Sequence, residues 1–320
     1  MRLALTLLAL TLLSALGGCS GGDNTPPGED SAHALLIDGR IERYRLYVPG
    51  RAQRANEPLP LLIALHGGGV NAASMDELTD LKALADRKGF LYMRPQGYDA
   101  ENRGFQTWNA GSCCGEAEAA GIDHVAVINT MIDDVAAQFD VDPARIYVTG
   151  HSNGGMMAYR LACQLSDRIA AIAPNSSYQM DRDYDRLLQP TVYACQPSRP
   201  VPVLHMHGLA DTCAPFEGGQ STGIEGGERP PVADSIDFWV GNNRCSSGPV
   251  ETYRNGDSRC VTYSGCEDGA DVVLCTTDSA GHVWPGSLKL GAEGVCGGQT
   301  TTRLDANTTL WQFFEQHPKP

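Results

Sequence analysis

The amino-acid sequence predicts an α/β protein with a doubly wound, mostly parallel sheet in a single domain. Short β-rich runs alternate with stretches of helical periodicity along the chain, and no internal repeat interrupts them. The run at residues 61–65 is uninterruptedly apolar, which is typical of a strand covered on both faces. At 320 residues, the chain is long enough to bury one large core.

The expected elements follow this alternation of strand and helix. A hairpin comes first, because an Asp-Gly turn at residues 38–39 separates two runs with β-type alternation. Apolar residues at helical spacing between residues 127 and 135 predict a helix after a long loop. The strands are expected at residues 35–48 (the hairpin), 61–65, 90–93, 146–149, 169–173, 201–207, 261–263 and 272–275. The helices are expected at residues 74–88, 123–139, 156–165, 235–241 and 304–316.

The composition is that of an ordinary globular protein, with 42% hydrophobic and 19% charged residues. It excludes a disordered chain and an integral membrane protein. The formal net charge of −14 argues against nucleic acid or another polyanion as a partner.

The first residues have the pattern of an export signal. Arg2 precedes an apolar stretch at residues 3–16, which is too short for a comfortable membrane span. The Leu-Gly-Gly-Cys sequence that ends at Cys19 resembles the bacterial lipobox, whose cysteine carries a lipid; a plain secretory signal is the alternative. We expect an exported protein in the cell envelope, on the periplasmic or extracellular side, with a lipid on Cys19 as its only membrane contact. The expected division is a lipoprotein signal peptide at residues 1–18, a flexible tether at 19–33 and the folded domain at 34–320.

Export implies an oxidising compartment, in which cysteines pair. With Cys19 set aside, ten of the 11 cysteines remain, enough for five disulfide bonds. A zinc site is the competing interpretation, but no C-x-x-C pair or clustered His/Cys spacing supports it, so we expect no metal. The expected pairs are Cys163 with Cys195 and Cys245 with Cys266, and the adjacent Cys113 and Cys114 bond either to each other or to different partners.

The sequence Gly-His-Ser-Asn-Gly at residues 150–154 matches the pattern G-x-S-x-G. It lies between a β-rich run and a good helix former, and this context indicates a nucleophile elbow with Ser152 as the nucleophile. The alternative is a serine in an ordinary glycine-rich turn. The strand and helix beside it favour the elbow, and with it the α/β-hydrolase type of sheet.

A serine nucleophile needs a base, and the base needs an orienting carboxylate. This type of fold supplies them in the chain order serine, acid, histidine, each on a loop after a strand. Asp211 follows the strand expected at 201–207, and His282 follows the last expected strand, so these two are the predicted acid and base. Asp234 and Asp237 are rival acids, but they have the position of helix-start residues.

Other polar groups near these motifs have predicted roles. The oxyanion hole is expected to use the backbone N–H of Asn153 and that of Gly68 or Gly69, in the glycine run after residues 61–65. His151 is expected to pack beside the site or line its pocket. The histidines His66, His205 and His207 are expected to be structural.

Five motifs occur in one order: Leu-His-Gly-Gly-Gly at 65–69, Trp-Asn at 108–109 before Cys-Cys-Gly at 113–115, the elbow, His-Gly-Leu-Ala-Asp at 207–211, and Gly-His-Val-Trp-Pro-Gly at 281–286. Together they resemble the polyhydroxybutyrate depolymerase-like esterases, the group that also holds feruloyl and acetylxylan esterases of carbohydrate esterase family one. The resemblance implies Ser152, Asp211 and His282 as catalytic residues and no metal or organic cofactor. Trp108 and Trp284 lie in two of these motifs, and we expect them to bind substrate together with His151.

The resemblance implies a serine esterase that cleaves feruloyl or acetyl esters, whether small molecules or esters linked to plant polysaccharide. A depolymerase of hydroxybutyrate oligomers and a non-catalytic envelope binding protein are the alternatives. Residues 212–231 depart from the family pattern and place a Gly/Glu-rich loop where an acyl pocket is expected. The natural ester is therefore left open by the sequence.

Overall fold

The computed structural model of the protein describes residues 26–101, 103–188, 190–223, 226–287 and 296–320. The predicted signal peptide, the anchor Cys19 and the predicted tether up to residue 25 lie outside these residues. Within the described ranges, no helix combines the length and the apolar character needed to cross a membrane.

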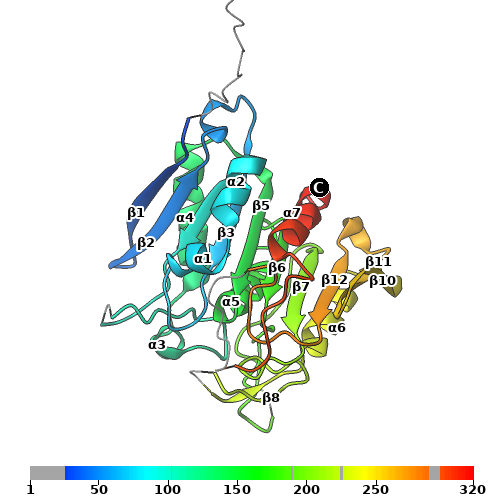
Figure 1. The fold of residues 1–320 in the computed structure, drawn as a ribbon. Helices are drawn as coiled ribbons and strands as arrows, with labels where there is room; N and C mark the ends of the chain where they lie inside the picture. Colours follow the sequence, from blue (N-terminus) through cyan, green and yellow to red (C-terminus); the bar gives the residue numbers. More distant parts are fainter. Residues whose placement is uncertain (1–25, 102, 189, 224–225, 288–295) are drawn as a thin grey trace, which may run out of the picture.

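A mixed ten-stranded sheet runs through the molecule in the order β1-β2-β4-β3-β5-β6-β7-β12-β11-β10 (Figure 1). The six central strands, from β4 to β12, are parallel, and an antiparallel pair extends the sheet at each edge. The strands are β1 (Glu29–Ile37), β2 (Arg40–Val48), β3 (Leu59–Leu65), β4 (Leu91–Pro95), β5 (Val141–His151), β6 (Ala171–Asn175), β7 (Val203–Gly208), β10 (Ser247–Asn255), β11 (Ser258–Ser264) and β12 (Val272–Thr277). A separate two-stranded sheet pairs β8 (Gly219–Gln220) with β9 (Glu228–Arg229).

Helices cover both faces of the sheet, because each central strand is apolar on both sides. In β3, Leu61 and Ile63 belong to one hydrophobic cluster, and Leu62 belongs to the other. The first cluster includes residues of α4, α5 and α6, and the second includes residues of α1, α2 and α7. The helices are α1 (Ser74–Leu78), α2 (Leu81–Lys88), α3 (Gly115–Ala119), α4 (His124–Gln138), α5 (Asn153–Gln164), α6 (Val232–Asn242) and α7 (Ala306–Gln316), with short 3₁₀ turns at Ala52–Arg54 and Glu267–Gly269. The predicted doubly wound α/β fold is confirmed.

Three local predictions differ from the structure. The sheet begins at Glu29, so residues 29–33 belong to β1 and not to the tether; backbone pairing with β2 holds this polar segment in the sheet. The helix expected at 74–88 is two helices, because Thr79 adopts an extended backbone and its hydroxyl bonds back to the Met75 carbonyl. Strand β10 was not predicted, because it is exposed along its whole length and has no apolar alternation.

The carboxyl ends of the central strands meet at one edge of the sheet, which we call the catalytic edge. The Gly-rich segment 66–69 follows β3, Ser152 follows β5, and Asp211 and His282 follow β7 and β12. Residues separated by more than 200 positions in the chain therefore lie at the same edge of the sheet. This is the edge at which open α/β sheets bind ligands.

Candidate active site

Ser152 lies at the turn between β5 and α5. Its backbone has φ +56° and ψ −124°, a conformation that residues with a side chain rarely adopt. The glycines of the turn are required by contact: a Cβ on Gly154 would lie 2.2 Å from the Leu65 carbonyl oxygen, and one on Gly150 would lie 2.4 Å from Gly154. The turn places Ser152 at the N-terminus of a 12-residue helix, where negative charge is stabilised.

His282 and Asp211 form a hydrogen-bonded pair at the same edge. Nδ1 of His282 lies 2.7 Å from Oδ2 of Asp211, and the other carboxylate oxygen accepts from the Ala214 N–H at 2.7 Å. The Asp211 side chain is fully buried and that of His282 is nearly so. Because Nδ1 of the neutral imidazole donates to the carboxylate, Nε2 is the atom left to accept a proton.

Asn175, the last residue of β6, links the serine turn to the histidine loop. Its carbonyl accepts from the Ser152 N–H at 2.9 Å. Its buried Nδ2 donates to the Val283 carbonyl at 2.9 Å and to Nδ1 of His151 at 2.8 Å. One residue thus binds the nucleophile's backbone and the backbone next to His282. Asn175 is absent from the predicted site, although a polar residue at the carboxyl end of an apolar strand is similar to the signal that points to Asp211.

His151 packs against the predicted base. Its ring centroid lies 4.6 Å from that of His282, and its Nδ1 accepts from Asn175, so its proton is on Nε2. Burial, together with the nearby His282 and His207, lowers the pKa of His151 well below its usual value. A neutral His151 ring carries no negative charge with which to stabilise a protonated His282, so it does not replace Asp211 in that role. The ring thus packs beside the predicted base, and contact of His151 with substrate stays a prediction.

The glycine run after β3 lies against the elbow. A Cβ on Gly68 would lie 3.5 Å from the Cβ of Asn153, whereas the N–H of Gly69 already donates to the Gln106 carbonyl at 2.9 Å. Within the described part of the chain, the backbone N–H groups of Gly68 and Asn153 have no such acceptor. Of the two glycines that the sequence leaves open, the geometry therefore favours Gly68.

The two tryptophans predicted to bind substrate are buried, and this prediction is wrong. Trp108 has no exposed surface; its indole N–H donates to the His66 carbonyl at 2.8 Å and its ring packs on His66. Trp284 is 1% exposed and donates to Oδ1 of Asn307 at 3.0 Å. Both indoles are packed in the interior and hold the loops that carry them through their N–H hydrogen bonds. Their places in the motifs gave no information on which way the rings point.

A buried chain of hydrogen bonds reaches the loop that carries Asp211. Nε2 of His207 lies 2.7 Å from the Ala214 carbonyl, which can only accept, so that nitrogen carries the proton. It follows that His205 Nε2 donates to His207 Nδ1 at 2.9 Å, and that the Tyr159 hydroxyl donates to His205 Nδ1 at 2.8 Å. Burial lowers the pKa of both imidazoles, so they stay neutral. The structural role predicted for His205 and His207 is support of the Asp211 loop.

Five disulfide bonds join the ten cysteines of the described residues. The predicted pairs Cys163–Cys195 and Cys245–Cys266 are confirmed, and Cys113 bonds to Cys114. The bonds Cys260–Cys275 and Cys213–Cys296 were not predicted. The Cys213–Cys296 bond holds the loop of Asp211. The Thr212 N–H of the same loop also donates to the Cys296 carbonyl at 2.9 Å.

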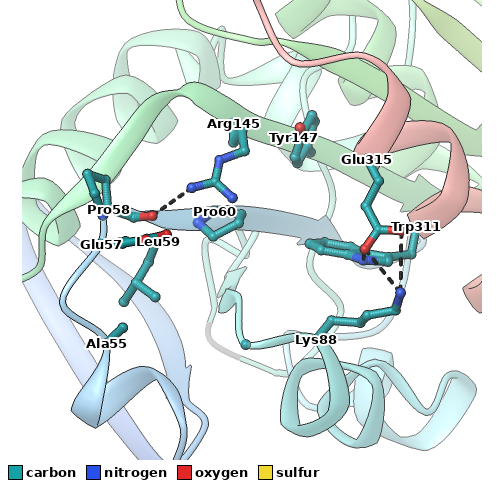
Figure 2. Close-up of a pocket in the computed structure, with 11 residues that line it drawn as sticks. Ala55, Glu57, Pro58, Leu59, Pro60, Lys88, Arg145, Tyr147, Trp311 and Glu315 are labelled. Atoms are coloured by element: carbon teal, nitrogen blue, oxygen red, sulfur yellow. Dashed lines mark hydrogen bonds and ion pairs between the residues drawn. The ribbon is translucent and has the colours of Figure 1, made fainter.

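A hollow of ≈ 290 Å³ lies away from the catalytic residues, at the amino ends of β3 and β5 (Figure 2). Its basic side chains are already paired. Lys88 lies 3.0 Å from Glu315, which also accepts from the Trp311 indole at 2.6 Å, and Arg145 donates to the Pro58 carbonyl at 2.7 Å. Among the described residues, no group of three or more His, Cys, Asp or Glu side chains is placed to hold a metal ion.

The sequence of this chain matches a known protein family. The family model for esterase PHB depolymerases matches residues 42–207, just over half of the chain. The chain belongs to this family. Membership places it among the carboxylic ester hydrolases, and the resemblance seen in the five sequence motifs is confirmed.

Individual relatives agree with the family. Feruloyl esterase B of Piromyces equi is 30% identical over 238 residues, which cover 74% of this chain but only 41% of that protein. Probable feruloyl esterase C of Aspergillus niger is 27% identical over 301 residues, 87% of this chain and 95% of that one. An acetyl xylan esterase structure from Aspergillus awamori superposes with a TM-score of 0.58 at 14% identity, covering 88% of this chain and 98% of that one. At this identity the structural likeness shows the shared fold.

Proposed function

We propose that this family member is an exported serine esterase that cleaves feruloyl or acetyl esters through a Ser152–His282–Asp211 triad and an acyl-enzyme intermediate. The observation that carries the proposal is the placement of the His282–Asp211 pair beside the strained turn of Ser152, with Asn175 binding the backbone at both places. The three chain positions have the order and the strand ends that this fold uses for its triad.

The reaction has two stages of the same form. The Ser152 hydroxyl attacks the ester carbonyl while Nε2 of His282 takes its proton, and that proton then passes to the departing alkoxide. A water molecule attacks the acyl-enzyme in the second stage, again with His282 as base and then as acid. Asp211 keeps the imidazole in the tautomer with the proton on Nδ1 and stabilises the imidazolium that forms.

The oxyanion of each tetrahedral intermediate would accept hydrogen bonds from the backbone N–H groups of Asn153 and Gly68. Both N–H groups lack a backbone acceptor in the described chain, and the two residues pack against each other. Each such donor contributes about 3 kcal/mol to transition-state stabilisation in serine hydrolases. The N-terminus of α5 adds to the same field.

The names of the relatives support the substrate class. The relatives from Piromyces equi and Aspergillus niger are feruloyl esterases, and a relative from Neocallimastix patriciarum, 31% identical over 153 residues, is a bifunctional acetylxylan esterase/xylanase. We propose a small aromatic or acetyl ester, free or linked to polysaccharide, as the substrate. The description of the family favours a second candidate, a short hydroxybutyrate oligomer.

Export is the cellular setting that we propose for this chemistry. Five disulfide bonds require an oxidising compartment, and the lipobox-like sequence at Cys19 supplies a tether to the cell envelope. Labelled fatty acid fed to expressing cells is expected to appear in the wild-type protein and not in Cys19→Ser.

Hydrolysis assays with Ser152→Ala as control test the proposal. Methyl ferulate, acetylated xylan, p-nitrophenyl acetate and a hydroxybutyrate trimer separate the substrate classes, and Ser152→Ala is expected to lose on the order of 10³ to 10⁶ in turnover. Near-wild-type turnover by that variant rules out the triad, and preference for the trimer selects the second candidate. A folded protein that turns over none of these esters and resists a fluorophosphonate probe would be a binding protein.

A further inference from the structure

A second hollow, of ≈ 440 Å³, lies between the start of β2 and the loop that follows β4. We call it the side cavity and define it by Arg40, Arg43, Gln96, Tyr98, Asp99 and Gln106 among its lining residues. None of these residues belongs to the proposed triad or oxyanion hole.

The side cavity opens on the catalytic edge. Because β2 runs antiparallel to β4, the residues that begin β2 lie where β4 ends, and the Gln96 N–H donates to the Arg43 carbonyl at 2.9 Å. Gln106 connects the cavity to the oxyanion loop: its N–H donates to the Val70 carbonyl at 3.2 Å and its carbonyl accepts from Gly69. Two or three strand spacings of ~4.8 Å separate the cavity from Ser152, about 10 to 14 Å.

The walls are polar and offer unused hydrogen-bonding groups. Gln106 is 3% exposed, and within the described part of the chain its buried Oε1 has no hydrogen-bond partner. The guanidinium of Arg43 makes a single 3.3 Å contact with the Ile41 carbonyl and has no carboxylate within ion-pair distance among the described residues. The charge of Arg40, by contrast, is paired with Glu42 at 3.0 Å.

These groups fit a ligand rich in hydroxyls. A sugar hydroxyl both donates and accepts, so it can pair with Gln106 Oε1 and with the Arg43 guanidinium, and Tyr98 adds an aromatic ring to the lining. Polyanions are disfavoured by the carboxylates of Asp99 and Glu42 in the same walls and by the net charge of −14. The scarcity of apolar side chains disfavours the aromatic acyl group.

We propose that the side cavity binds sugar units attached to the alcohol half of the ester, so that the enzyme acts on esterified oligosaccharide in preference to simple alkyl esters. The inference rests on the proposed esterase function and extends it to the leaving group. A short oligosaccharide bridges the distance from Ser152 to Arg43 and Gln106, whereas a methyl ester leaves the cavity empty.

Kinetics with two substrates test the proposal. Methyl ferulate and a feruloylated xylo-oligosaccharide are compared for the wild type, Arg43→Ala, Gln106→Leu and the control Arg244→Ala, which removes an exposed arginine paired with Glu267. Arg43→Ala and Gln106→Leu are expected to lower kcat/KM for the oligosaccharide ester about tenfold, mainly through KM, and for methyl ferulate by less than twofold. Arg43→Lys is expected to restore part of the loss. Equal losses on both substrates, or no loss in either variant, overturn the inference.

A binding measurement separates this inference from the proposed function. Calorimetric titration of Ser152→Ala with the ester-free xylo-oligosaccharide is expected to show binding that Ser152→Ala/Arg43→Ala loses. If the wild type hydrolyses neither ester but this binding is seen, the esterase proposal fails and the cavity stands. If the wild type hydrolyses methyl ferulate but no oligosaccharide binds, the cavity assignment fails and the esterase stands.

Discussion

The side chain of Asn153 binds both main-chain groups of Trp108. Its Oδ1 accepts from the Trp108 N–H at 2.7 Å, and its Nδ2 donates to the Trp108 carbonyl at 3.1 Å. The residue that follows the nucleophile therefore holds the loop of Trp108 as a strand partner would. Because the backbone of Asn153 is also the proposed oxyanion donor, the position of that donor depends on a side-chain clamp 45 residues away in the chain.

We predict that Asn153→Ala lowers kcat about tenfold while retaining the proposed oxyanion N–H. The buried N–H of Trp108 loses its partner, whereas the carbonyl keeps the bond from the Cys114 N–H at 3.0 Å; the unpaired N–H costs about 1–3 kcal/mol of unfolding free energy. Turnover of p-nitrophenyl acetate and urea unfolding measure the two effects. Asn129→Ala, which removes a contact to Arg168 away from the site, serves as the control. Wild-type turnover and stability in Asn153→Ala would show that the clamp has no effect.

Asp211→Asn is predicted to lower kcat by about 10³ to 10⁴ with little change in fold. The asparagine amide donates to Nδ1 of His282, which moves the ring proton to Nε2 and prevents that atom from accepting the Ser152 proton. Asp234→Asn, at the rival acid on α6, is the matched control and is expected to retain wild-type turnover. The reverse ranking of the two variants in an ester hydrolysis assay would exchange the roles of the two acids.

The catalytic edge was predictable because its residues directly follow buried strands. Ser152 lies in a turn whose glycines are required sterically, and Asp211 and His282 follow apolar runs in the chain order of the fold. The strands themselves were recognisable wherever both faces are buried, as in β3. Edge strand β10 was not, because pairing of the backbone and not an apolar pattern holds it in the sheet.

The sequence did not predict the direction in which individual side chains point. Trp108 and Trp284 occupy motif positions but face the interior, where the Trp108 indole N–H finds the His66 carbonyl. Asn175 shows the converse, because its importance comes from partners on two distant segments, His151 and Ser152 on one and Val283 on the other, that only the folded sheet brings together. The Cys213–Cys296 bond likewise joins residues whose spacing of 83 carries no local signal.

Asn175→Ala is predicted to lower kcat about 10- to 100-fold and to leave KM for small esters nearly unchanged. Loss of Nδ2 frees the Val283 carbonyl and the His151 ring, so His282 loses the support that orients it, whereas the substrate pocket is retained. Asn243→Ala is a matched control: Asn243 is equally buried and its Nδ2 also bonds two groups, the Val201 and Ala270 carbonyls, outside the site. Both variants are expected to be less stable, but only Asn175→Ala loses kcat. An equal kcat in the two folded variants would make Asn175 purely structural.

Stability is predicted to fall as the pH is lowered below about 6.5. Burial lowers the pKa of His66 to about 4, below its usual value of 6.5, so between these values the unfolded chain binds more protons than the fold. The difference corresponds to about 3 kcal/mol that is present above pH 6.5 and lost by pH 4. His66→Gln removes this proton-linked loss, so its unfolding free energy is expected to change less between pH 7 and 4.5 than that of the wild type. Parallel pH profiles in urea unfolding would show that His66 does not contribute.

Removal of the Cys213–Cys296 bond is predicted to reduce both stability and catalysis. Its loop of 83 residues gives a chain-entropy contribution of about 4.5 kcal/mol, against about 3 kcal/mol for the 21-residue separation of Cys245–Cys266. Removal of these two bonds is expected to differ more in its effect on activity than in its effect on stability. Cys213 lies two residues after Asp211, so Cys213→Ala/Cys296→Ala loosens the acid loop and lowers kcat about tenfold at a temperature where the variant is folded. Cys245→Ala/Cys266→Ala removes a bond between α6 and the end of β11, away from the triad, and is expected to keep wild-type kcat. If both pairs of substitutions change only the unfolding free energy, the bond stabilises the fold without positioning Asp211.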